Sequence, residues 1–273
     1  IANLFGRFNN ARTAYQRLSA FMEETQAATD AQENNSSIRR PELGDLEFRA
    51  VKFRYPMQEV DTLLDINVKI NKGEKVAVLG RNGSGKTTLV KLASGLFGCS
   101  DGIVMYDGVD TKQIHNDDLS RSIGIVLQDV QLFSGSIIEN ITMGREGISQ
   151  EDIVNAAKIT GLDDFLGKVP GGYEMVLQDK GNGLSGGQRQ AIAITRAIVH
   201  KPSHFIFDEP TSAMDMNSEQ YFIKNFQETY EDSTLIVVSH RMPLVNLVDR
   251  IIVMSDGKII DDGPRDEIIK KLQ

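Results

Sequence analysis

The sequence predicts an α/β protein: a mixed, mostly parallel sheet with helices, antiparallel strands on its N-terminal side and a helical segment inserted in the middle. Three observations predict this class. The apolar run KVAVLG at 75–80 leads through a glycine-rich turn into a helix, as a strand buried on both faces does. Two more apolar runs, HFIFDE at 204–209 and TLIVVSH at 234–240, have the same character. Between 128 and 184 the apolar spacing is helical instead.

The first 26 residues are expected to form an amphipathic helix, because apolar side chains recur at three- and four-residue steps from Ile1 to Met22. Two interpretations stay open: the helix packs against protein, or it lies on a membrane surface. Residues 27–43 are polar and aperiodic, which is typical of a linker. The folded domain is therefore expected over 44–273.

Strands are expected where polar and apolar residues alternate or where apolar runs stand between turns. The alternation at 46–55 and 63–70 predicts antiparallel strands with one exposed face. GIVMYDG at 102–108 predicts another strand, and SIGIVLQ at 122–128 a second buried one. RIIVMSDGKII at 250–260 predicts a final hairpin that turns at Ser-Asp-Gly.

Two helices are expected in or next to the insertion, which we place at about 129–200. Ser149, with Asp152 three residues later, predicts the start of a helix that Gly161 ends. GGQRQAIAITRAIVH at 186–200 predicts a second helix, stopped by the proline that follows.

Composition and charge narrow the class of protein. The 273 residues are 40% hydrophobic and 25% charged, which is typical of a globular chain. A net charge of −8 disfavours a broad electrostatic grip on nucleic acid, so no nucleic-acid partner is expected. Cys99 is the single cysteine, which excludes an internal disulfide and a zinc array. The sequence has no long apolar span and no cleavable leader, and because it begins at Ile1 we expect it to be part of a longer chain.

A P-loop is predicted at 80–87, where GRNGSGKT matches G-x-x-x-x-G-K-[ST] between a strand and a helix. Its glycines let backbone N–H groups converge on phosphate oxygens, and the helix N-terminus adds a positive end. Lys86 is expected to reach the β- and γ-phosphates of a nucleotide, and Thr87 to bind Mg²⁺. The predicted phosphate-binding residues are Gly80, Arg81, Asn82, Gly83, Ser84, Gly85, Lys86, Thr87 and Thr88.

Two carboxylates, Asp208 and Glu209, end the apolar strand HFIFDE. Ligands of open α/β sheets bind at that edge of the sheet. Asp208 is expected to hold Mg²⁺, and Glu209 to take a proton from an attacking water.

A second glycine-rich run, LSGGQRQ at 184–190, stands before a helix and is called the signature loop below. Ser185 is expected to cap that helix, while Gly186 and Gly187 leave its first N–H groups bare, which makes another anion site. The sequence alone gives this site no ligand.

The P-loop, LSGGQRQ, FIFDEPTSAMD and VVSHR occur in this order, and together they resemble the nucleotide-binding domain of an ATP-binding cassette (ABC) transporter, from about residue 43 to the end. The resemblance implies a P-loop ATPase core with an antiparallel β-subdomain and an inserted α-helical subdomain. It implies a head-to-tail homodimer that binds Mg-ATP. In that dimer Ser185, Gly186, Gly187 and Gln188 face the γ-phosphate of the ATP on the opposing P-loop.

Further site residues follow from the same resemblance. Gln128 matches the loop glutamine that senses the γ-phosphate, Mg²⁺ and the membrane domain. Asp215 ends the run Ser212 to Asp215, which matches the loop that crosses the dimer interface. His240 matches the histidine that contacts the γ-phosphate, and Tyr55 the aromatic residue that stacks on adenine.

The run DVQLFSGSIIENITMG after Gln128 resembles the exporter branch of the family. In that branch a helix like 1–26 continues a fused transmembrane domain into the cytosol, which implies a place at the cytoplasmic face of the inner membrane. SAMD at 212–215 resembles bacterial type I protein or peptide secretion ATPases, with a periplasmic adaptor and an outer-membrane partner. Lipid and drug exporters stay open as alternatives. Exporters commonly carry G-E-x-G ahead of LSGGQ, whereas Asp179 holds the acidic position here.

Two other classes share this nucleotide chemistry. A soluble cassette ATPase that acts on DNA or ribosomes usually carries long coiled-coil insertions or two cassettes, and this sequence has neither. A regulatory ATP-binding module without turnover is disfavoured by the presence of Glu209 and His240.

Overall fold

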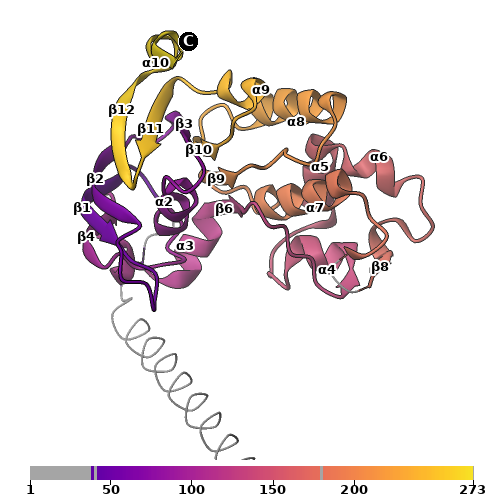
Figure 1. Ribbon diagram of the computed structural model, residues 1–273. Helices are drawn as coiled ribbons and strands as arrows, with labels where there is room; N and C mark the ends of the chain where they lie inside the picture. The colour runs from indigo at the N-terminus through magenta and orange to yellow at the C-terminus, as the bar shows by residue number, and fades with distance from the viewer. Residues whose placement is uncertain (1–37, 40–41, 179–180, 273) are drawn as a thin grey trace, which may run out of the picture.

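The computed structural model describes residues 38–39, 42–178 and 181–272. The helix expected at 1–26 and most of the linker expected at 27–43 lie outside the described residues, as does Asp179. In the described part, the two larger β-sheets lie on one side of the molecule, and the inserted helices form a lobe on the other (Figure 1). No helix of this part combines the length and the hydrophobicity that a bilayer crossing requires.

An antiparallel sheet forms the N-terminal side of the described domain. Its strands follow the order β2-β1-β4-β5, and β1 pairs antiparallel with both β2 and β4. The apolar residues of the alternating pattern point inward, and a bulge after Phe48 breaks the register where Ala50 has a φ of 50°. The strands predicted at 46–55, 63–70 and 102–108 are therefore confirmed, while the short strand β5 was not predicted. The bounds are β1 Leu46–Phe53, β2 Leu63–Ile70, β4 Asp101–Tyr106 and β5 Val109–Asp110.

The main sheet has the order β12-β11-β3-β10-β9-β6, and every neighbouring pair in it is parallel except β11 with β12. Three of the runs predicted as buried strands, KVAVLG, HFIFDE and TLIVVSH, lie in the interior of this sheet, whereas SIGIVLQ forms one edge. The predicted hairpin adds the antiparallel strand at the other edge. The strands are β3 Lys75–Gly80, β6 Ile123–Val126, β9 His204–Asp208, β10 Thr234–Val238, β11 Arg250–Ser255 and β12 Lys258–Pro264.

Each face of the main sheet has its own hydrophobic core, because side chains alternate along a strand. Val76 and Val78 pack with the antiparallel sheet and helix α2, Lys86–Ala93. Ala77 between them packs with the helices on the opposite face. Both faces are therefore covered, which explains the nearly continuous apolar runs in the central strands.

The inserted segment is mostly helical, as predicted. Ser149 and Asp152 form the predicted capping box, and Gly161 ends the helix in a left-handed conformation. The prediction of an all-helical insertion was wrong in one detail, because two short strands pair antiparallel beside α4. The elements are β7 Gly135–Ser136, α4 Ile137–Thr142, α5 Gln150–Thr160, α6 Leu162–Leu166, the 3₁₀ turn η2 Gly172–Glu174, β8 Val176–Leu177 and α7 Gly186–Ile198.

Several helices outside the insertion complete the described part. The charged segment after β5 forms the 3₁₀ turn η1 and helix α3. Three later helices were not predicted, and the longest of them, α8, packs against α5. The bounds are η1 Thr111–Gln113, α3 Asn116–Ser122, α8 Met216–Thr229, α9 Met242–Val245 and α10 Arg265–Leu272.

Candidate nucleotide-binding site

The P-loop connects β3 with α2 at the carboxyl edge of the main sheet, and its tight path requires glycine. Gly80 has a φ of 151° and Gly85 a φ of 100°. A Cβ on Gly80 would lie 2.3 Å from the carbonyl oxygen of Met254, and a Cβ on Gly85 would lie 2.6 Å from the side chain of Leu63. The backbone of the loop therefore has the close turns that the phosphate-binding pattern predicts.

Lys86 lies under the P-loop and is only 8% exposed. Its Nζ donates hydrogen bonds to the carbonyl oxygens of Gly80, at 2.8 Å, and Arg81, at 3.0 Å. The hydroxyl of Ser84 is buried in the same loop and has no hydrogen-bond partner among the described residues. A buried hydroxyl without a partner is costly, and a phosphate oxygen in the loop would satisfy it. The loop thus fits a phosphate group.

A hollow of about 250 Å³ opens in front of the P-loop. It gathers residues from the P-loop, the end of β6, the end of β9 and the segment after β10. Ten predicted site residues line it: Asn82, Gly83, Gly85, Lys86, Thr87, Thr88, Gln128, Asp208, Glu209 and His240. Residues far apart in the sequence therefore meet at one edge of the sheet.

Thr87 and Asp208 form the part of the hollow that fits a divalent cation. The hydroxyl of Thr87 donates a hydrogen bond of 2.6 Å to the carboxylate of Asp208, which is 1% exposed. Burial raises the pKa of Asp208, while the Thr87 hydrogen bond and the charge of Lys86 act in the opposite direction. A cation beside this carboxylate would favour its charged form.

The donor set is the kind that Mg²⁺ uses. Mg²⁺ prefers oxygen ligands and is usually held by one or two carboxylates together with waters and substrate phosphates. Asp208, Thr87 and Gln128 can supply such oxygens. No group of three or more His, Cys, Asp or Glu side chains converges as a metal site in the described part of the chain, and Mg²⁺ bound with phosphate does not need one.

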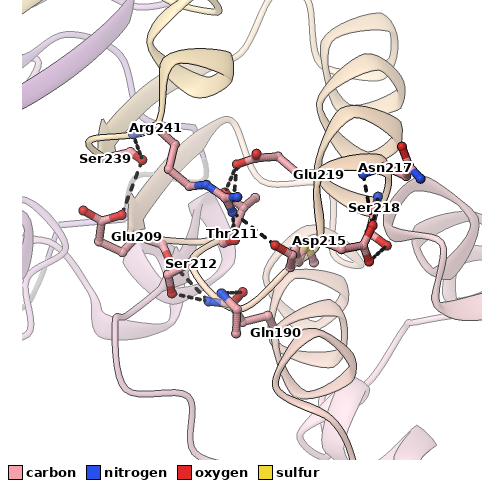
Figure 2. A network of polar contacts seen from close by, with 12 residues as sticks. Gln190, Glu209, Thr211, Ser212, Asp215, Asn217, Ser218, Glu219, Ser239 and Arg241 are labelled. Carbon is pink, nitrogen blue, oxygen red and sulfur yellow. Dashed lines mark hydrogen bonds and ion pairs between the residues drawn. The ribbon is translucent and has the colours of Figure 1, made fainter.

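Glu209 follows Asp208 in a strained conformation, with a φ of 50°. Its N–H donates to the carbonyl of Val238 at 2.8 Å, and its carboxylate accepts a long hydrogen bond of 3.4 Å from Ser239 (Figure 2). The Nε2 atom of His240 lies 4.0 Å from the same carboxylate. A non-glycine residue in this region costs about 1–3 kcal/mol and tends to occur at functional sites. The turn directs Glu209 into the hollow beside His240.

Tyr55 does not line the hollow in front of the P-loop. It lines a different hollow with Pro56 and Asp61. Its ring packs edge-on against Phe53, at a centroid distance of 4.8 Å, and its hydroxyl forms a 3.1 Å hydrogen bond with the hydroxyl of Thr88. Because Thr88 lines the P-loop hollow, Tyr55 stands next to it, and adenine stacking stays a prediction.

Substitutions of Tyr55 separate stacking from packing. If the ring stacks on adenine, Tyr55→Ala should weaken ATP binding about 3- to 10-fold, the usual worth of an aromatic contact. Tyr55→Phe should leave the dissociation constant within about twofold and cost about 1 kcal/mol of stability through the lost hydrogen bond to Thr88. Titration with ATP and thermal unfolding measure both effects. An equal effect of the two substitutions on affinity would contradict adenine stacking, because phenylalanine keeps the ring.

The signature loop starts α7 with the cap that the sequence predicts. The Ser185 hydroxyl accepts a hydrogen bond of 3.2 Å from the N–H of Gln188, and the Gln188 side chain accepts one of 2.8 Å from the N–H of Ser185. A Cβ on Gly186 would lie 2.9 Å from the Cβ of Ala213, so this glycine is also needed for close packing. The described residues that line the P-loop hollow include none of Ser185 to Gln188.

Asp215 also lies away from the P-loop hollow. Its carboxylate caps α8 by accepting hydrogen bonds of 3.0 Å from the N–H groups of Asn217 and Ser218 (Figure 2). A 2.7 Å hydrogen bond from the Ser218 hydroxyl, together with these two backbone bonds, lowers the pKa of Asp215. The structure thus gives Asp215 a local role, and its nucleotide contact stays a prediction.

The order of these features matches one known family. The family model described as "ABC transporter" matches residues 63–212, which is more than half of the chain and includes the P-loop, the signature loop and Glu209. This chain belongs to the ABC transporter family. It is an ATPase domain of that family, and its sheets and inserted helices are those of the ABC ATPase fold.

Relatives of this ABC ATPase domain include translocation proteins for bacterial toxins. The leukotoxin translocation ATP-binding protein LktB of a Pasteurella haemolytica-like species is 38% identical over 99% of the chain and 38% of that protein. The alpha-hemolysin translocation ATP-binding protein HlyB of Escherichia coli is 42% identical over 87% of the chain and 34% of that protein. The chain thus spans little more than a third of the length of these relatives.

A solved structure shows the same fold. A bacterial Atm1-family ABC exporter with ATP bound aligns with a TM-score of 0.79 at 30% identity. The alignment covers 84% of this chain and 40% of the exporter.

Sequence reasoning missed three residues of this ABC ATPase domain. Thr62 lines the P-loop hollow from the loop before β2, where no motif marks it. Arg241 and Gln190 hold the loop after Glu209 (Figure 2). A glutamine that interrupts the apolar face of α7 was the only signal for Gln190, and it named no partner.

Proposed function

We propose that the chain is the ATP-hydrolysing domain of a membrane exporter and that it works as a head-to-tail homodimer. Its nucleotide-binding domain is assigned to 44–273, with the helical subdomain at about 129–200. One observation carries this proposal. The chain has two loops built to bind phosphate, yet the signature loop does not line the hollow formed by the P-loop. The signature loop is therefore free to bind the nucleotide of a second copy.

ATP binding begins at the P-loop. Lys86 now bonds to two carbonyl oxygens of its own loop, and it is within reach to transfer these bonds to the β- and γ-phosphates. Ser84 and the glycine N–H groups add donors in the same place. Thr87, Asp208 and Gln128 would hold Mg²⁺, which when bound supplies positive charge to the phosphate oxygens.

Hydrolysis depends on Glu209. Its carboxylate lies in the hollow and can take a proton from a water aimed at the γ-phosphate. Ser239 and His240 lie beside this carboxylate and limit its orientation. The opposing signature loop would close the site with the bare N–H groups at the start of its α7 and exclude bulk water.

The exported cargo is proposed to be a protein or peptide, as in type I secretion. Identities of 38% and 42% to proteins named for toxin translocation support this over a lipid or drug exporter. We assign the domain to the cytoplasmic face of an inner membrane. Its proposed partners are a fused transmembrane domain continued by 1–26, a periplasmic adaptor and an outer-membrane protein.

Lys86→Ala tests the proposed ATPase site. The purified chain should hydrolyse ATP only with Mg²⁺, and the variant should lose about 100-fold or more of this activity, because the charge on the transferred phosphoryl group is no longer neutralised. Phosphate release and ATP titration measure the two effects. Lys258→Ala, at an exposed lysine on β12, is the matched control and should keep the parent rate. Hydrolysis that survives Lys86→Ala would reject the site.

A further inference from the structure

Gln190 is a buried polar residue whose side chain forms hydrogen bonds with the loop that follows β9. It lies in the second turn of α7 and is 4% exposed. Its Nε2 donates hydrogen bonds to the Ser212 hydroxyl, at 2.8 Å, and to the Glu209 carbonyl, at 3.3 Å. Its Oε1 accepts one of 2.8 Å from the N–H of Ala213 (Figure 2). The side chain thus joins α7 to the backbone that carries Glu209.

The backbone of Glu209 needs such support, because its left-handed conformation is unfavourable by itself. Three contacts hold it. The N–H donates to Val238, and the carbonyl accepts from the N–H of Ser212 at 3.3 Å and from Gln190. Of these, the bond from Gln190 is the one that comes from the helix of the signature loop.

Close packing makes the link between α7 and this loop stiff. A Cβ on Gly186 or Gly187 would lie 2.9 or 3.3 Å from atoms of Ala213, so the first turn of α7 lies directly on the loop. A shift of Ser185 therefore moves Ala213 and Gln190 together. The start of α7 is thus joined to the Glu209 carbonyl by one turn of helix and one side-chain hydrogen bond.

The other side of the loop has an independent support. Arg241 donates to the carbonyl oxygens of Thr211 and Met214 and forms a 3.3 Å ion pair with Glu219, which is buried on α8 (Figure 2). The loop is therefore anchored to α8 and to the segment beside His240 without Gln190. Loss of the Gln190 side chain alone should leave the loop folded, because Arg241 still holds it. The side of the loop that faces α7 would lose its hydrogen bonds to this helix.

We propose that Gln190 is a positioning residue for hydrolysis, which rests on the function proposed above. When the signature loop binds the ATP of the opposing chain, Gln190 shifts with α7 and aligns the backbone of Glu209 in its own chain. Each signature loop would then help to close the partner's site and also align the general base of its own. This gives the two sites of a dimer a direct mechanical connection.

Gln190→Met tests the proposal, since methionine keeps the length of the side chain and removes all three hydrogen bonds. We expect kcat for ATP to fall about 10- to 100-fold, the effect of a misplaced reacting group, with KM and ATP affinity within about twofold of the parent. Gln227→Met, at an exposed glutamine on α8, is the matched control and should change neither.

Ser212→Ala provides the second variant, because it removes one partner of Gln190 and keeps the buried glutamine. If the two residues act through one bond, the double variant should lose no more activity than Gln190→Met alone, as coupled neighbours do. Losses that multiply would overturn the proposal. An unchanged kcat in Gln190→Met would also overturn it. So would a variant with a lower kcat, a higher KM and a lower melting temperature, because that combination indicates general damage to the fold.

The outcomes separate the two proposals. A parent chain without Mg-dependent ATP hydrolysis would contradict the proposed function itself. A parent chain that hydrolyses ATP, loses this activity on Lys86→Ala and keeps it on Gln190→Met would contradict only the role of Gln190.

Discussion

Glu209→Gln is expected to bind ATP with nearly the parent affinity and to hydrolyse it about 10²- to 10⁴-fold more slowly, the usual contribution of a positioned general base. The amide has the size of the carboxylate and can still accept a hydrogen bond from Ser239, but it cannot take a proton from water. The strained turn at Glu209 is held by backbone bonds to Val238 and Ser212, so the fold should persist.

Two measurements check this expectation. Phosphate release should be almost absent, and size-exclusion chromatography with Mg-ATP should show a dimer that accumulates because hydrolysis no longer reopens it. Glu228→Gln, at an exposed glutamate on α8, should behave like the parent. Parent-rate turnover in Glu209→Gln would show that another group acts as the base.

Ser185→Arg is expected to spare ATP binding and to abolish dimer closure and hydrolysis. Ser185 does not line the P-loop hollow of its own chain, so a large side chain there should not disturb binding to Lys86 and its neighbours. The substitution removes the cap of α7 and fills the anion site in front of its first N–H groups. Loss of donors of this kind lowers rates about 100-fold or more.

ATP titration and analytical ultracentrifugation with Mg-ATP separate binding from closure in this variant. Loss of the cap costs about 1 kcal/mol, so a lower melting temperature is expected. Ser120→Arg, at an exposed serine of α3, controls for the added charge. A variant that closes and turns over like the parent would remove the signature loop from the reaction.

Much of this site could be predicted from the sequence because its signals are local. The P-loop glycines and Lys86 act within one turn, and the caps at Ser149 and Ser185 are set by residues three positions away. Each of these interactions forms between neighbours in the chain, so a short pattern is enough to identify it.

Contacts across the fold could not be read in this way. The three hydrogen bonds of Gln190 reach residues 19 to 23 positions away, and no spacing pattern marks them. Helix α8 was missed because only Phe222 and Phe226 among its apolar residues are buried, and the charged Glu219 interrupts the same buried face. The capping of α8 by Asp215 followed from no family pattern either. In each case tertiary packing decides the role of the residue.

We propose that the two phosphate loops of one chain serve two different nucleotides, and mixing two inactive variants tests this proposal most directly. Lys86→Ala disables the P-loop and Ser185→Arg the signature loop, so each pure variant should be inactive. A mixed dimer has one complete site, made by the P-loop of the Ser185→Arg chain and the signature loop of the Lys86→Ala chain. Its other site holds no ATP, so the arginine meets no phosphate there.

An equal mixture with Mg-ATP should regain activity, with about a quarter of the parent rate as the ceiling, because half of randomly paired dimers are mixed and one of their two sites is intact. The recovery should fall below this ceiling, because the chain that binds ATP has its own signature loop opposite an empty site and lacks the alignment of Glu209 proposed for Gln190. Phosphate release from the mixture, compared with each variant alone, is the measurement. A clear gain on mixing is the predicted result. A mixture as inactive as its separate components would contradict the claim that the signature loop of one chain acts on the nucleotide of the other.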